Sequence, residues 1–215
     1  MTGGASGGRR RSARSRAGRR ENTDPAAGQA SRQEPPADPQ QQARTICLRL
    51  LAVRPRTRAE LADALRRRGI PELDATAVLE RYGEVGMIDD ETFAKAWVSS
   101  RHAARGLARG ALARELRQRG VDSSTISAAL EEVDGDTERA TARSLVERRL
   151  RSMPGVAPDV AFRRLVGMLT RKGYSPGLSV RTVRDVLAEA PDTGEFLDAV
   201  DVDAMVDGAQ GPSYG

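Results

Sequence analysis

Three segments of the chain repeat one pattern: LADALRRRGI at residues 61–70, LARELRQRGV at residues 112–121 and LVGMLTRKGY at residues 165–174. Each segment has leucines eight and four residues before its glycine, and the glycines are Gly69, Gly120 and Gly173. Leucines four residues apart share one face of an α-helix, and a glycine in the left-handed conformation commonly ends a helix. The pattern therefore predicts three copies of one helix, each closed by a glycine after which the chain folds back onto the last turn.

The residues on both sides of each segment extend the helical pattern. Apolar residues recur at spacings of three and four, without the alternation that is typical of strands. A leading helix is expected before each segment, at residues 44–53, 90–105 and about 136–152, and a third helix is expected after each glycine. Candidate capping residues for these helices are Thr57 with Glu60, Asp74, Asp122 and Ser179. The predicted fold class is all-α.

These helices are expected to form tandem repeats between two tails. Three three-helix repeats are predicted at residues 43–86, 87–134 and 135–190, flanked by a basic arm at 1–42 and an acidic tail at 191–215. The arm contains no Ile, Leu, Val, Phe, Trp or Tyr, so we expect it to be disordered. Each repeat is too small to bury its apolar stripe alone, which predicts that neighbours stack into an elongated, curved and monomeric array.

Composition narrows the possible functions. The formal net charge is +5, and the basic body suits a polyanion or an acidic protein surface, between which charge alone does not choose. One cysteine, Cys47, and one histidine cannot build a disulfide or a Cys/His zinc site, and no catalytic or nucleotide-binding motif is present. We therefore expect a non-enzymatic protein without metal or cofactor. The basic N-terminus lacks the apolar segment of a signal peptide or membrane span, which predicts a cytoplasmic protein.

The middle repeat holds the most unusual residues of this aromatic-poor chain. Asp89 is expected to cap the helix that follows it, with Ile88 packing against Phe93. Phe93 and Trp97 lie four residues apart on one helix face, and we interpret them as core residues rather than as a platform for nucleic-acid bases. His102 has no evident partner in the sequence and is expected to fill a surface or an interface.

The same stretch resembles the signature of the RecX regulatory proteins. The matching residues are Ile88, Asp89, Asp90, Phe93, Ala94, Trp97, Val98, Arg101, Gly106, Gly110, Glu115, Leu116, Arg119, Gly120 and Val121. The resemblance spans residues 43–190 and is tightest in the middle repeat. It implies a regulator of three-helix repeats that binds the filament of the RecA recombinase and inhibits its ATPase, strand-exchange and coprotease activities, with a place in DNA repair, homologous recombination and the SOS response.

Basic side chains are the candidate residues for binding RecA or single- and double-stranded DNA. Those of the middle repeat surround the GLARG link and exceed what helix ends require: Arg101, Arg105, Arg109 and Arg114. The others lie in the last turn before a closing glycine: Arg66, Arg67, Arg68, Arg117, Arg119, Arg171 and Lys172. Cations in a last turn also stabilise the helix end, so that role is an alternative to partner binding. A solvated charged face is the alternative for the middle group.

Two other classes of protein stay open at this point. The stretch TRAELADALRRRGI at residues 57–70 resembles the start of a helix-turn-helix motif, so a DNA-binding transcription factor is the main alternative. Its threefold repetition and the lack of a wing disfavour that class. A scaffold that binds only protein is the second alternative, and it would show no salt-dependent affinity for DNA.

Overall fold

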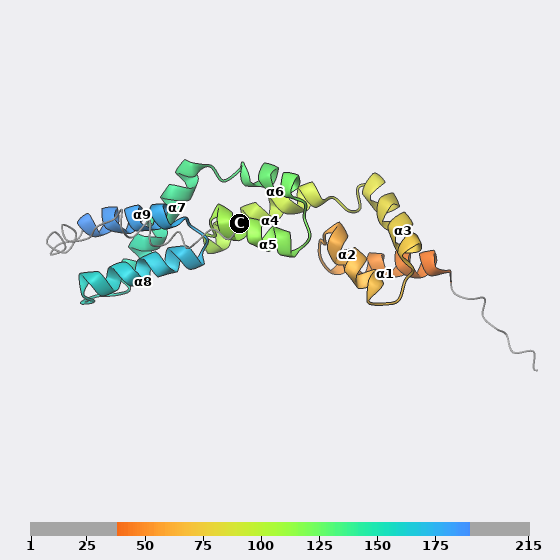
Figure 1. Ribbon diagram of the computed structural model, residues 1–215, viewed down its shortest axis with the longest axis horizontal. Helices are drawn as coiled ribbons and strands as arrows, with labels where there is room; N and C mark the ends of the chain where they lie inside the picture. Colours follow the sequence, from red (N-terminus) through yellow and green to blue (C-terminus); the bar gives the residue numbers. More distant parts are fainter. Residues whose placement is uncertain (1–37, 190–215) are drawn as a thin grey trace, which may run out of the picture. The chain divides into compact units, whose positions relative to one another are not determined.

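The computed structural model describes residues 38–189, and every regular element in that range is a helix (Figure 1). The helices are α1 (Pro39–Val53), α2 (Arg58–Arg66), α3 (Glu72–Glu84), α4 (Asp90–Arg105), α5 (Arg109–Gln118), α6 (Ser123–Leu130), α7 (Gly135–Arg151), α8 (Pro158–Arg171) and α9 (Pro176–Ala188). The all-α class is thus confirmed. The acidic tail predicted at 191–215, and the predicted arm as far as residue 37, lie outside the described residues.

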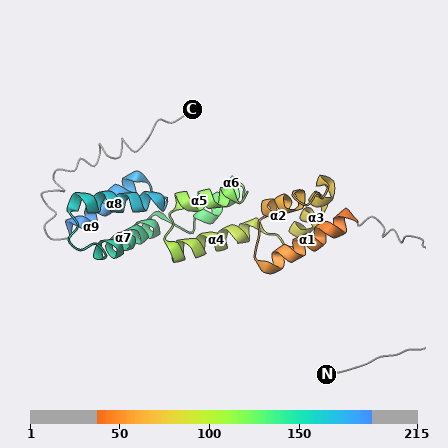
Figure 2. The same cartoon turned by 90° about the horizontal axis from the view of Figure 1, so that it is seen from below.

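The helices form three successive groups of three, each around its own apolar core (Figures 1 and 2). We call α1–α3, α4–α6 and α7–α9 the first, second and third units. The repeated leucines lie at the centre of each core and are fully buried: Leu61 and Leu65, Leu112 and Leu116, and Leu165 and Leu169. The leucines that the sequence pattern placed on one helix face are therefore the residues that each unit buries in its core. The repeat boundaries at residues 86, 134 and 190 stay predictions.

The second helix of each unit ends in the same glycine turn. Gly69, Gly120 and Gly173 have φ angles of 73°, 74° and 90°, in the left-handed region. The N–H of the residue that follows each glycine donates to the carbonyl of the leucine four residues before the glycine, at 3.2 Å in all three copies. This six-residue closure is a Schellman turn, and it satisfies carbonyl groups that a helix end leaves free.

Four local expectations are corrected by the structure. The first helix begins at Pro39, capped by Asp38, so residues 39–42 are helical rather than part of a disordered arm. Pro71, not Asp74, precedes the first residue of α3, because proline suits the entry to a helix. Ser175 caps α9, and Ser179 is buried inside the helix. Ile88 is buried in the core of the first unit, apart from the cluster that contains Phe93.

Candidate functional site

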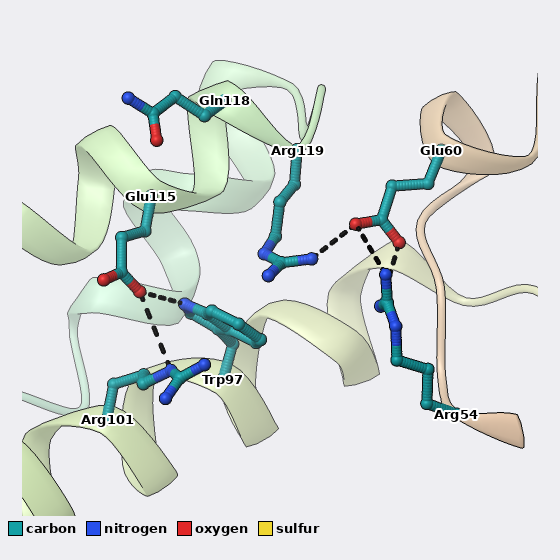
Figure 3. Close-up of a pocket in the computed structure, with 7 residues that line it drawn as sticks. All are labelled: Arg54, Glu60, Trp97, Arg101, Glu115, Gln118 and Arg119. Carbon is teal, nitrogen blue, oxygen red and sulfur yellow. Dashed lines mark hydrogen bonds and ion pairs between the residues drawn. The ribbon is translucent and has the colours of Figure 1, made fainter. Parts of the chain in front are cut away.

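Trp97 lies at the junction of the first and second units, on the face of α4 that looks toward α5 (Figure 3). Its indole Nε1 donates to a carboxylate oxygen of Glu115 at 2.9 Å. The same carboxylate pairs with Arg101 at 3.7 Å and with Arg105 at 3.3 Å. Glu115 therefore ties the aromatic ring and two arginines of α4 to α5.

Two guanidinium groups lie against the Trp97 ring. The Arg119 guanidinium carbon is 3.8 Å from the ring centroid, and that of Arg101 is 4.1 Å from it. Phe93 stacks on the ring as well, with centroids 5.7 Å apart and an interplanar angle of 16°. Such cation–π contacts contribute about 0.5–2 kcal/mol each, depending on exposure. Phe93 is a core residue, whereas Trp97 is only partly buried and serves as the support for two cations.

Glu60 connects this cluster to the first unit. Its carboxylate pairs with Arg54 at 3.2 Å and also with Arg119, which reaches it from the second unit (Figure 3). Together with Trp97, Arg101, Glu115 and Gln118, these residues line a pocket of about 430 Å³. We call this set of seven residues the Trp97 cluster. Its cations are matched by carboxylates, so it can hold two units together more readily than it can attract a polyanion.

Backbone contacts close the same junction. The Thr57 hydroxyl, fully buried, donates to the carbonyl of Arg119 at 2.6 Å and accepts from the N–H of Glu60 at 3.1 Å. The N–H of Arg58 donates to the Asp90 carboxylate at 2.9 Å. Burial raises the pKa of Asp90, an effect that the hydrogen bond from Arg58 partly opposes. The start of α2, in the first unit, thus donates hydrogen bonds to a carbonyl and to a carboxylate of the second unit.

The junction between the second and third units repeats this arrangement with other side chains. The N–H of Ala108 donates to the carbonyl of Lys172 at 2.9 Å, and the N–H of Arg109 donates to the Glu138 carboxylate at 2.9 Å. The buried Tyr174 hydroxyl donates to the carbonyl of Gly106 at 3.2 Å. Burial is the main reason that the pKa of Tyr174 is raised. This junction relies more on backbone groups than the first one does.

His102, expected to fill a surface or an interface, lies at this second junction, where it has partners that the sequence did not indicate. Its Nδ1 lies 2.9 Å from the carbonyl oxygen of Leu107, and its Nε2 lies 3.0 Å from the hydroxyl of Thr141 on α7. A neutral imidazole meets both partners by donating from Nδ1 and accepting at Nε2. His102 therefore links α4 to α7 as an interface residue with defined partners.

The predicted basic residues separate into engaged and free groups. Arg101, Arg105 and Arg119 gather at Glu115 and Trp97, while Arg109 donates to the carbonyl of Val133 at 3.2 Å on another side of the second unit. The cation directly before each closing glycine is engaged as well. Arg68 donates to Ala64, Arg119 pairs with Glu60, and Lys172 donates to the carbonyl of Arg105. Burial and nearby arginines lower the pKa of Lys172.

The other predicted residues face solvent. Arg66 is exposed and pairs with Asp63 at 2.8 Å on its own helix. The other four are exposed, and their guanidinium groups form no hydrogen bond or ion pair with the residues that the structure describes: Arg67, Arg114, Arg117 and Arg171. Each unit therefore presents at least one free guanidinium in the last turn before its closing glycine.

Glu60 and Arg54 belong to the Trp97 cluster but were not among the candidate site residues. Glu60 was assigned only to a capping box, and its N–H does meet Thr57, but its carboxylate turns to Arg54 and Arg119 instead. No local pattern in the sequence marked either residue as a contact between units. In residues 38–189, no three His, Cys, Asp or Glu side chains gather as a metal site would require, and no helix is long and apolar enough to cross a membrane.

The fold and its junctions define a class: an all-α protein built of tandem three-helix units that are joined through their glycine turns. Residues 43–81 match the family model of the first three-helix domain of RecX, and residues 89–130 match that of the second. The regulatory protein RecX of Streptomyces lividans is 55% identical over 168 residues, which cover 78% of this chain and 89% of that protein. The chain belongs to the RecX family of regulatory proteins.

Other relatives agree with this membership. The regulatory protein RecX of Thermobifida fusca is 59% identical over 152 residues, covering 71% of this chain and 82% of that protein. Among solved structures, RecX from Lactobacillus salivarius superposes with a TM-score of 0.64 at 18% identity, over 71% of this chain and 99% of that one. At that identity the structural likeness establishes the fold alone, and the array of three-helix units agrees with it.

Proposed function

We propose that this protein is a cytoplasmic regulator that binds the RecA filament and inhibits RecA ATP hydrolysis, strand exchange and coprotease activity, without catalysing a reaction itself. Membership of the RecX family supports the partner. The observation that carries the mode of binding is the recurrence of one free guanidinium per unit, at Arg67, Arg117 and Arg171. Because these residues occupy matching turns of linked units, they meet a repetitive partner such as a filament at several points.

Linked contacts explain how a monomer acts on many subunits. Each exposed arginine contributes little by itself, since a surface ion pair is worth about 0–1 kcal/mol. When the first contact forms, the others become intramolecular and gain from a high effective concentration. The protein then caps a filament or removes subunits from it at less than one molecule per RecA. Arg114, the other free arginine of α5, is the residue that we assign to DNA phosphates.

The test is RecA ATP hydrolysis on single-stranded DNA with and without the purified protein. Replacing Arg67, Arg117 and Arg171 together with Gln should raise the half-inhibitory concentration ~10-fold or more, because three linked contacts vanish together. The matched control replaces Arg81, Arg139 and Arg163, which are equally exposed but pair with a carboxylate on their own helices. The control should inhibit like the parent.

Two outcomes would count against the proposal. One is a parent protein that leaves RecA hydrolysis unaltered at equimolar concentration in moderate salt. The other is inhibition that excess single-stranded DNA reverses, since that means the protein only sequesters DNA. The second result would favour a general DNA-binding protein, and its affinity would then fall with salt at a slope of about 0.7 per phosphate contact.

A further inference from the structure

A second hollow adjoins the Trp97 cluster, with which it shares Arg54, Trp97 and Arg101, and its lining contains more apolar residues. It has a volume of about 510 Å³ and lies among the end of α1, the α1–α2 loop, the α3–α4 loop and α4. We call it the Met87 groove. Its apolar lining includes Leu51, Pro55, Met87, Phe93 and Ala96. Met87 has 43% of its surface exposed although it is a large apolar residue, so the groove presents apolar surface to solvent.

The rim of the Met87 groove is cationic. Arg54, Arg56 and Arg101 line it, and Asp89 is the one carboxylate in its lining. Asp89 is already occupied, because its two oxygens accept from the N–H of Thr92 at 2.9 Å and from the Thr92 hydroxyl at 2.6 Å. Arg54 and Arg101 are also engaged, with Glu60 at 3.2 Å and Glu115 at 3.7 Å, so Arg56 is the rim cation that has no carboxylate partner among the described residues.

Arg56 supplies an independent sign that an acceptor is missing. Its Nε is fully buried and has no hydrogen-bond partner among the described residues. A buried donor left without a partner costs about 1–3 kcal/mol, so native structures nearly always satisfy such groups. The groove that Arg56 lines is where an acceptor from another molecule could meet its guanidinium.

The chemistry of the groove favours a protein segment over a nucleic acid. A base would need a free aromatic face, but the Trp97 ring is already covered by the guanidiniums of Arg119 and Arg101, at 3.8 Å and 4.1 Å from the ring centroid. An apolar lining beside the unpaired Arg56 instead matches an apolar side chain next to a carboxylate. Such a residue buries its surface against Met87 while the carboxylate beside it reaches the Arg56 guanidinium.

We propose that the Met87 groove binds a protein segment that presents a large apolar side chain next to a carboxylate. This inference rests on the proposed function, because the RecA filament is the partner that would carry the segment. It deepens that function by adding an apolar contact with protein at the first junction to the contacts of the exposed arginines.

The test is co-sedimentation of the full-length protein with RecA filaments formed on single-stranded DNA. Met87→Glu places a carboxylate in the groove and should weaken filament binding ~10-fold or more, as loss of a central apolar anchor commonly does. Arg56→Ala should also weaken it, without lowering the urea midpoint of the free protein. Leu73→Glu is the matched control, since Leu73 is exposed on α3 outside the groove, and it should bind like the parent.

A second measurement separates protein binding from DNA binding. Affinity for single-stranded DNA without RecA, followed by anisotropy, should be unchanged in Met87→Glu and Arg56→Ala. If both variants bind filaments like the parent, the groove inference is overturned while the proposed function stands. If they lose DNA affinity equally, the groove is a nucleic-acid site and the inference is also overturned. If the parent itself fails to bind filaments, the proposed function falls and the inference falls with it.

Discussion

The two junctions between units place the same glycine turn against a helix start, but they differ in how closely the backbones meet. At the first junction, a Cβ on Gly120 would lie 2.3 Å from the Cβ of Ala59, a side-chain atom. At the second, a Cβ on Gly173 would lie 2.3 Å from the backbone nitrogen of Ala111. Side chains, among them Glu60 and Arg119, therefore separate and link the units at the first junction. At the second junction, the backbone at Gly173 packs directly on the backbone at Ala111.

Gly69 shows what the turn requires when no unit packs on it. Its φ of 73° matches that of Gly120, yet a Cβ there would meet nothing within 4 Å. The glycine has one role at this position, which is to end the helix. At Gly120 and Gly173 it has a second role, which is to let the preceding unit approach. Three positions that look alike in sequence thus carry different constraints.

The largest effect is expected for Gly173→Ala. The new methyl group strains a residue with a φ of 90° and collides with the backbone of Ala111, which cannot move without moving α5. Left-handed strain and overpacking together should lower the free energy of unfolding by ~4 kcal/mol. Urea unfolding followed by circular dichroism measures this. A loss no larger than that of Gly69→Ala would mean that the second junction is not tightly packed.

Gly120→Ala should cost less, at ~3 kcal/mol, because its methyl group meets a side chain rather than the backbone. The collision can be relieved from the other side. Adding Ala59→Gly to Gly120→Ala removes the opposing methyl group, so the double variant should regain part of the lost stability in spite of the cost of a new helical glycine. Strictly additive losses in this double-mutant cycle would contradict the close approach of the two residues.

Gly69→Ala should have the smallest effect of the three substitutions, ~1 kcal/mol, which is the strain of an alanine in the left-handed region alone. Nothing surrounds the site, so larger residues should cost little more than alanine does, apart from β-branched ones. The ordering of the three urea midpoints is the measurement that matters. Equal midpoints would mean that the glycines act only as helix stops and that close packing at the two junctions does not affect the free energy of unfolding.

Replacing the junction carboxylate in Asp90→Asn should change the free energy of unfolding least, and the change should depend on pH. Burial raises its pKa in the folded protein, so its contribution to stability is present below the unfolded pKa of about 3.9 and declines as the pH rises through the folded pKa. The cost of Asp90→Asn should therefore grow as the pH falls from 7 to about 4. Hydrogen bonds from Thr92 lower the pKa of Asp89 instead, so the cost of Asp89→Asn should stay nearly constant over that range and shrink only as the pH falls below the unfolded pKa of about 3.9.

Most of the fold could be predicted because its determinants are local. Each determinant acts within a few residues of its own position and can therefore be recognised in the sequence. These determinants are the leucine stripe, the closing glycines and the caps at Thr57, Asp89 and Asp122. Three of the four errors were shifts of a few residues in where a helix begins, at Pro39, Pro71 and Ser175. The fourth arose from packing outside the local pattern. Ile88 was expected to pack forward on its own helix, but it is buried in the core of the first unit instead.

The site was less predictable for the same reason. The sequence marked Arg119 as a cation in a last turn, but only the fold shows that it reaches Glu60, 59 residues earlier in the chain. Arg67, Arg117 and Arg119 all lie in the last turn before a closing glycine, yet the guanidinium groups of the first two are free and that of the third is engaged between units. How one unit packs on the next decides which of these arginines is engaged. No local sequence pattern predicts that packing.

The direction of the junctions bears on how the chain is made. In both junctions the later glycine turn packs onto a helix start that belongs to the earlier unit, so the receiving surface always precedes the docking one along the chain. During synthesis, each unit leaves the ribosome after the surface that it needs has already emerged. The glycine turn of the first unit docks on no earlier unit, and the start of α2 is the surface on which the second unit docks, as the start of α5 is for the third.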